Sequence, residues 1–157
     1  MAEVGPLDGI ARADTARLLV RGLIRHLHHL DMTGLPEFIL PNGRRADLVA
    51  LGRNGEIWIV EIKSSVEDFR TDVKWQHYRP FCDRFFFASH VGVPEGIFPA
   101  EAGFILCDAF GAAVMRDNEK IALAPATRKA MTIEIARLAA LRLNTLLDPE
   151  SGRGPEF

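Results

Sequence analysis

Residues 44–65 decide the fold: they read RRADLVALGRNGEIWIVEIKSS, two apolar runs joined by a short glycine-containing link. Runs rich in Val, Ile, Leu and Trp favour strands, and such a link between them predicts a β-hairpin. If Arg53-Asn54-Gly55 is a three-residue loop with Gly55 in the left-handed conformation, Gly52 opposes Glu56. One face of the hairpin then carries the opposed pairs Arg45 and Lys63, Asp47 and Glu61, Val49 and Ile59, and Leu51 and Ile57.

The opposite face of this hairpin is predicted to be wholly apolar. It contains Ala46, Leu48, Ala50, Trp58, Val60 and Ile62. A two-residue loop would instead oppose Asp47 to Val60 and place charged side chains on both faces. The three-residue register is favoured because it separates the polar from the apolar side chains.

The flanking segments predict an α/β domain with a mixed sheet. Strands are expected at 37–40, 45–51, 56–63, 84–90 and 103–108, and helices at 14–30, 65–79 and 127–147, with Asp14 and Ser65 as N-caps of the first two. The PNG and GRNG links predict an antiparallel three-strand meander, and the strand–helix–strand unit predicts a crossover to a parallel fourth strand. Flanking helices complete this core, and the last helix is expected to cover one face of the sheet.

Length and composition indicate one packed domain. The chain has 157 residues and a formal net charge of −2, so no global basic field marks it as a nucleic-acid binder. Residues 1–147 are predicted to form the domain, and residues 148–157, DPESGRGPEF, a flexible tail. Two cysteines without CxxC spacing, and no long apolar run, favour a cytoplasmic protein with reduced thiols and no membrane contact.

The opposition of Asp47 and Glu61 is the strongest sign of chemistry. Two carboxylates about 5 Å apart repel by about 3 kcal/mol at an effective dielectric near 20, and this repulsion must be offset. Lys63 could offset it as a counter-ion, or Mg²⁺ or Mn²⁺ could lie between the carboxylates. The second arrangement suits metal-assisted phosphodiester hydrolysis, with Lys63 steadying the attacking water or the developing charge. If Lys63 is only a counter-ion, the cluster has a structural role and no catalytic one.

Asp47 and the Glu61-Ile62-Lys63 segment resemble the core of the PD-(D/E)XK nuclease superfamily. The segments RRADLVAL, EIWIVEIKSS, DFRTDVKWQHYRPFCDRFFFA, AGFILCD and PATRKAM look more closely like the MmcB family of bacterial DNA-repair endonucleases. The resemblance covers about residues 11–143 and implies a restriction-endonuclease-like core. It also implies that Asp47, Glu61 and Lys63 are catalytic, with the carbonyl of Ile62 as a further metal ligand. Ala46 stands where the superfamily name has proline.

Further residues are candidates for the same site. Glu37 opposes Asp47 if Pro41-Asn42-Gly43 is a three-residue loop, and turns away if the turn has two residues. The resemblance suggests Gln76 and Lys74 as groups near the phosphate. Arg17, Arg21 and Arg25 recur at i+4 spacing on one helix face, which is either a solvated face or a stripe that contacts phosphates. Arg45, on the charged face of the hairpin, is a further candidate for DNA contact.

The sequence therefore predicts a Mg²⁺- or Mn²⁺-dependent DNA endonuclease that acts in repair. Two alternatives remain open: a nucleic-acid-binding module that keeps the fold without cutting, and a subunit active only with another protein. A homodimer or other repair proteins are possible partners besides DNA.

Overall fold

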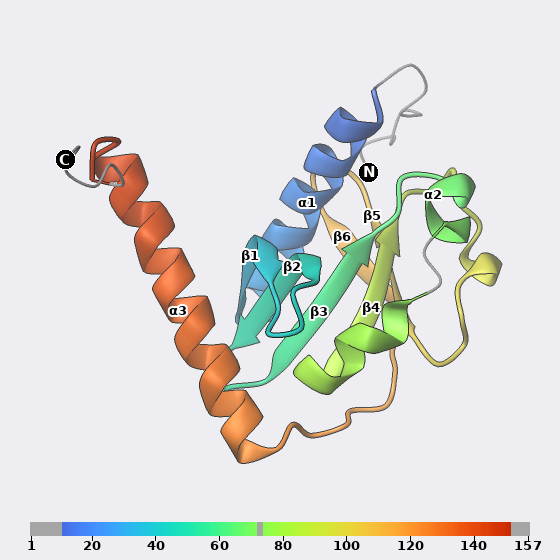
Figure 1. The fold of residues 1–157 in the computed structure, drawn as a ribbon. Coiled ribbons are helices and arrows are strands. Elements are labelled where there is room, and N and C mark those ends of the chain that lie inside the picture. Colours follow the sequence, from blue (N-terminus) through green and yellow to red (C-terminus); the bar gives the residue numbers. More distant parts are fainter. Residues whose placement is uncertain (1–10, 72–73, 152–157) are drawn as a thin grey trace.

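The protein is a mixed α/β domain built on one open six-stranded sheet (Figure 1). The computed structural model describes residues 11–71 and 74–151. The strands follow chain order: β1 (Met32–Ile39), β2 (Arg45–Gly52), β3 (Ile57–Ile62), β4 (Arg84–Ser89), β5 (Gly103–Cys107) and β6 (Ala112–Arg116). The helices are α1 (Arg12–His29), α2 (Val66–Arg70), the 3-10 helices η1 (Trp75–Phe81) and η2 (Glu95–Ile97), and α3 (Pro125–Leu147).

The predicted meander and crossover are confirmed. β1, β2 and β3 pair antiparallel, β3, β4 and β5 pair parallel, and β6 returns antiparallel to β5. The predicted hairpin register is also confirmed, because Leu51 opposes Ile57 and Gly55 has a φ of 84°. The PNG link is a three-residue loop in which the Leu40 N–H donates to the Arg44 carbonyl at 2.7 Å.

Two apolar layers hold the sheet between helices. On one face, α1 buries Leu19, Leu23 and Leu27 against side chains such as Leu48 and Val60. The other face is packed by α2, η1 and the first half of α3, through aromatic residues of the crossover and Met131 and Ile135 of α3. Among the described residues, α1 is the helix that packs on this face (Figure 1).

The alternation of side chains is interrupted where β1 and β2 oppose each other at residues 37 and 47. Leu35 and Phe38 contact the same core layer although they are three residues apart, and Glu37 between them has a φ of 52°. On β2, Ala46 packs with Val49 rather than with Leu48. The prediction that Ala46 shares a face with Leu48 and Ala50 is therefore wrong: the alternation on β2 breaks at Asp47, opposite Glu37 of β1.

The crossover is not the single helix predicted for residues 65–79. α2 ends at Arg70, residues 72–73 lie outside the described part, and η1 follows from Trp75. The rings of Phe69 and Trp75 both contact Phe87, with centroids 5.4 and 6.0 Å away. Residues six apart on one α-helix point about 120° apart, so a continuous helix could not place both rings there.

Other elements also differ from the prediction. α1 begins at Arg12 with Ala11 as its N-cap residue, so Asp14 lies in the first turn and is not the cap, whereas Ser65 does cap α2. β6 was not predicted, because its residues alternate between half-buried and exposed on a short edge strand. α3 buries only Met131 and Ile135 fully, and Leu143, Leu146 and Leu147 are exposed, so it covers the sheet over part of its length only.

Residues 152–157 of the predicted flexible tail lie outside the described residues. Within the described ranges 11–71 and 74–151, no helix is both long and apolar enough to cross a membrane. Cys82 and Cys107 are buried free thiols, and burial raises the pKa of each to about 12.

Candidate active site

The strand pairing of β2 and β3 ends at Leu48 and Val60, and two carboxylates occupy the next position. The Asp47 N–H donates to Oε1 of Glu61 at 3.0 Å. In return, Oδ2 of Asp47 accepts from the N–H of Ile62 at 2.8 Å. Side-chain bonds thus replace the backbone ladder at this point, and they hold both carboxyl groups at the ends of the two strands.

Lys63 follows directly after β3 on a backbone that is fixed to β4. Its N–H donates to the Ala88 carbonyl at 2.9 Å, and the Ser89 hydroxyl donates to the Lys63 carbonyl at 2.5 Å. The Lys63 residue is only 6% exposed and Glu61 only 4%. A lysine and a glutamate are rarely so buried unless they are paired, so this end of the sheet concentrates charge in a shielded place.

Burial dominates the electrostatics of Asp47 and raises the pKa of its carboxyl group. The N–H of Ile62 and the positive charges of Lys63 and Arg45 act in the opposite direction, while the Asp68 carboxylate adds to the rise. A cation close to Asp47 would therefore stabilise its ionised form.

These residues line a surface pocket of about 770 Å³ between the strand ends and the start of α1. The pocket brings together Glu37, Arg45, Asp47, Glu61, Ile62, Lys63 and, from α1, Arg17. Three polar residues that were not predicted also line it, namely Arg12, Ser64 and Asp68. Asp68 accepts from the Ser64 N–H at 3.0 Å, while its own N–H donates to the Ser65 hydroxyl at 3.1 Å. The Ser-x-x-Asp spacing is the sequence signal for this capping arrangement.

Other predicted residues lie outside the pocket. Gln76 belongs to η1 and Lys74 immediately precedes it, and both are exposed. Arg21 and Arg25 are exposed further along α1. Glu37 lines the pocket, yet residues 11–71 and 74–151 contain no cluster of three or more acidic, His or Cys side chains suited to a metal ion. The candidate ligand oxygens are therefore those of Asp47, Glu61 and the Ile62 carbonyl.

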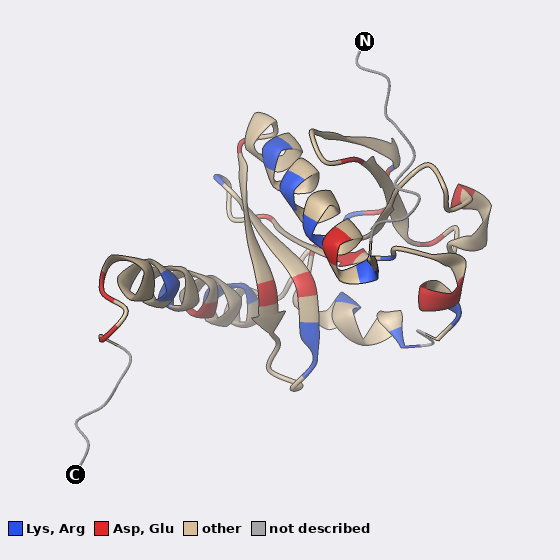
Figure 2. Cartoon of the chain, turned by 90° about the horizontal axis from the view of Figure 1, so that it is seen from above, with Lys and Arg blue, Asp and Glu red and all other residues tan. Residues whose placement is uncertain are grey.

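Basic residues extend from the pocket along α1. Figure 2 shows Lys and Arg positions recurring along the outer side of this helix, near acidic positions on the adjoining strands. The Arg17 side chain is 84% exposed, and its closest carboxylate contact is Asp14 at 4.0 Å. Successive i+4 arginines on α1 rise by about 6 Å, so the helix presents a row of cations that starts at the pocket.

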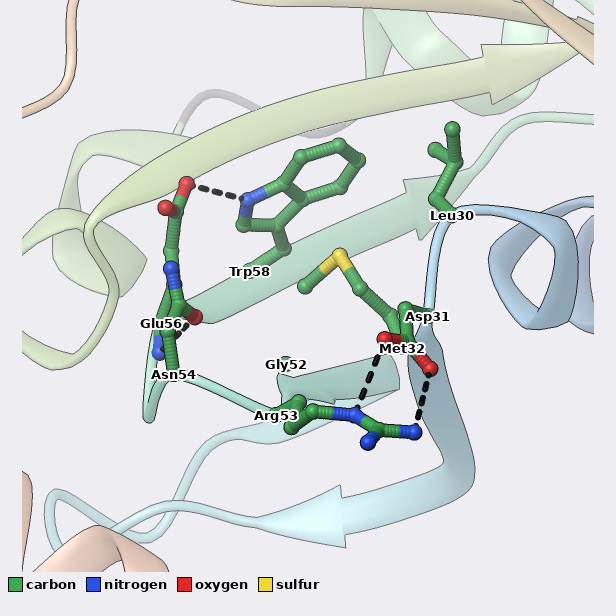
Figure 3. A pocket seen from close by; sticks show the side chains of 8 residues that line it. All are labelled: Leu30, Asp31, Met32, Gly52, Arg53, Asn54, Glu56 and Trp58. Atoms are coloured by element: carbon green, nitrogen blue, oxygen red, sulfur yellow. Dashed lines mark hydrogen bonds and ion pairs between the residues drawn. The ribbon is translucent and has the colours of Figure 1, made fainter.

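A second pocket, of about 530 Å³, lies at the other end of β2 and β3 (Figure 3). Arg53 at its rim binds Asp31 through Nε at 2.9 Å. Glu56 accepts from Trp58 Nε1 at 2.8 Å and also pairs with Arg84 and Lys120. The polar groups of this pocket bind one another, and we place the candidate active site in the larger pocket.

Comparison with known proteins identifies relatives over nearly the whole chain. The model of the family described as MmcB-like DNA repair protein matches residues 4–150. A solved structure of a protein of unknown function from Silicibacter pomeroyi is 40% identical and superposes with a TM-score of 0.85. This similarity covers 95% of the present chain and 99% of the other. No protein with a curated description matches the sequence.

Proposed function

Because the chain belongs to the MmcB-like family of DNA repair proteins, we propose that it is a metal-dependent DNA endonuclease. Asp47, Glu61 and Lys63 would be its catalytic residues. The observation that carries the proposal is the pair of crossed hydrogen bonds between Asp47 and the Glu61-Ile62 segment, which holds two carboxylates beside a buried lysine. The arrangement matches the PD-(D/E)XK resemblance of the sequence.

The donor set fits Mg²⁺ or Mn²⁺. Both are hard cations that prefer carboxylate and carbonyl oxygens, and Asp47, Glu61 and Ile62 supply these. An N–H bond uses only one of about four acceptor positions of a carboxylate, so the crossed bonds leave the groups able to coordinate. When bound, the metal would polarise the scissile phosphate and acidify a water molecule.

The chain's own residues would orient the ligands, stabilise the developing charge and bind the DNA. The crossed bonds orient the two carboxylates before DNA arrives, and the fixed backbone on both sides of Lys63 limits where its ammonium group can reach. Preorganised charge of this kind stabilises the negative charge that develops on the phosphate. Arg17 and Arg45 at the pocket, with Arg21 and Arg25 beyond it, would bind the DNA backbone.

Titration of Mn²⁺ into the protein, followed by calorimetry, tests the metal site directly. The wild-type protein is expected to bind Mn²⁺, and Asp47→Ala and Glu61→Ala to lose this binding. Glu134→Ala removes an exposed carboxylate of α3 as a matched control and should bind as the wild type does. Equal Mn²⁺ binding by Asp47→Ala would refute the site. DNA binding without any Mn²⁺ binding by the wild type would favour the non-cleaving module.

Replacing Arg17, Arg21 and Arg25 together with alanine should weaken binding to duplex DNA. Affinity falls with salt, and each neutralised phosphate makes the slope of log affinity against log salt more negative by about 0.9. The slope of the triple variant should therefore be less negative by about 0.9 for each arginine that binds a phosphate in the wild type. The control triple replaces Arg53, Lys129 and Arg137, which are exposed and do not belong to α1. Fluorescence anisotropy over a salt series measures both slopes. An unchanged slope in the α1 triple would make these arginines a solvated face.

A further inference from the structure

The tip of the β5–β6 turn carries an exposed aromatic ring that folding does not require. Phe110 is 70% exposed, and the positions around it are Asp108 and Gly111 of a tight turn. Single exposed apolar residues are common, but a phenyl ring on a turn tip gives up its burial energy and occupies a place where Gly and Asn are usual. The position in which the turn holds this ring suggests a role for its exposure.

The turn is rigid. The Asp108 N–H donates to the Gly111 carbonyl at 3.0 Å and closes it. The Asp108 carboxylate accepts from the backbone N–H groups of Phe110 and Gly111 at 2.6 and 2.8 Å. An aspartate that accepts from the N–H groups two and three residues further along fixes the backbone of the tip. The ring of Phe110 is thus presented from a braced position.

The turn is also pressed against α1. A Cβ atom added to Gly22 would lie 1.9 Å from the Asp108 carbonyl oxygen and 2.7 Å from that of Gly111. Only glycine allows this approach, so the helix and the turn pack backbone to backbone. Phe110 reaches the surface beside the exposed side of α1, where it lines a surface pocket with Arg25, His28 and His29.

We propose that Phe110 is a stacking platform for an unpaired nucleobase of DNA bound along the arginine row of α1. Single-stranded DNA binders combine cations that follow the phosphates with aromatic rings on which bases stack, and Arg25 and Phe110 place these two groups together. A base inside an intact duplex has no free face. The inference rests on the proposed DNA-binding function and deepens it, since it makes DNA with unpaired bases the preferred substrate.

Anisotropy titrations in EDTA buffer test this proposal with three labelled DNAs: an oligothymidine single strand, a gapped duplex and an intact duplex. Phe110→Ala should weaken binding to the single strand about 5- to 150-fold, the range for loss of one stacked base. Its affinity for the intact duplex and its salt slope should stay at wild-type values. A loss on the gapped duplex as well would place the base in a gap, whereas a loss on the single strand alone would place it in a free strand.

Two variants separate stacking from other causes. Phe110→Trp keeps an aromatic face and should retain affinity, whereas Phe110→Leu keeps only apolar volume and should bind like Phe110→Ala. All three should melt as the wild type does, because the ring is exposed. Three outcomes would refute the stacking role of Phe110 without refuting DNA binding. Phe110→Ala could keep wild-type affinity for every DNA, it could lose as much affinity for the intact duplex, or Phe110→Leu could keep full affinity. No binding of the wild type to any DNA would overturn the proposed DNA-binding function with it.

Discussion

Replacing Asp83 with asparagine is expected to lower the free energy of unfolding by about 3–5 kcal/mol, the cost of breaking a buried ion pair. Asp83 is fully buried and accepts two bonds from the Arg128 guanidinium, at 2.6 and 2.7 Å. It also accepts from the backbone N–H groups of Ile57 and Leu123 at 2.8 and 3.0 Å. Asparagine has the same shape but turns an amide group toward donors, so at least one buried donor loses its acceptor. The midpoint of urea unfolding measures the effect.

Asp117→Asn is the matched control. Asp117 also binds an arginine, Arg84, but its side chain is 65% exposed, and exposed pairs contribute at most about 1 kcal/mol. A similar loss of stability in both variants would contradict the special role of Asp83.

The pH dependence of stability provides a second check on Asp83. Burial raises the pKa of the Asp83 carboxyl, but the bonds from Arg128, Ile57 and Leu123 outweigh this effect and lower the pKa from 3.8 to about 2. A carboxyl whose pKa is lower in the folded state adds stability above pH 4, and that stability is lost as the pH falls from about 4 to 2. Between pH 4 and pH 2 the free energy of unfolding of the wild type should therefore fall by about 2 kcal/mol more than that of Asp83→Asn.

The register of the β2–β3 hairpin could be predicted from sequence because a single-residue slip would move its apolar set to the wrong face. The same reasoning brings Asp47 to Glu61, where a hydrogen bond from the Asp47 N–H to the Glu61 carboxylate follows the last strand pair. It fails at Ala46, where the alternation on β2 breaks opposite Glu37, a residue with a positive φ of 52°. No local pattern marks this conformation, which is unusual for a residue other than glycine or asparagine.

Most of the features that could not be predicted from sequence depend on contacts between segments that are far apart in the chain. Asp83 looks like an ordinary loop aspartate, yet its partner Arg128 lies 45 residues away. Arg12 and Asp68 join the pocket only because α1 and the start of α2 meet at the end of β3, where Arg12 binds Glu67 at 2.8 Å. The division of the crossover into α2 and η1 follows from the packing of two rings on Phe87, which helix propensity does not encode.

Lys63→Ala is expected to reduce DNA cleavage by about two to three orders of magnitude, the usual loss when one preorganised electrostatic donor is removed. Lys63 lies two residues after Glu61, about 6.6–6.8 Å further along the chain, so its ammonium group can reach a phosphate without displacing a metal held by the carboxylates. Mn²⁺ affinity should be retained or should rise, since a competing positive charge has gone. Rates on DNA and calorimetric Mn²⁺ titrations of the same preparation measure the two effects separately.

Melting temperatures with and without Mg²⁺ distinguish this role of Lys63 from that of a counter-ion. If Lys63 only makes the burial of Asp47 and Glu61 tolerable, Lys63→Ala should melt earlier than the wild type in metal-free buffer, and Mg²⁺ should restore its stability because it binds the folded state. Lys129→Ala, which removes an exposed lysine of α3, controls for the loss of one charge. A Lys63→Ala protein that melts normally, binds Mn²⁺ and cuts DNA at the wild-type rate would refute the proposed active site, because every role given to the buried lysine changes one of these three quantities.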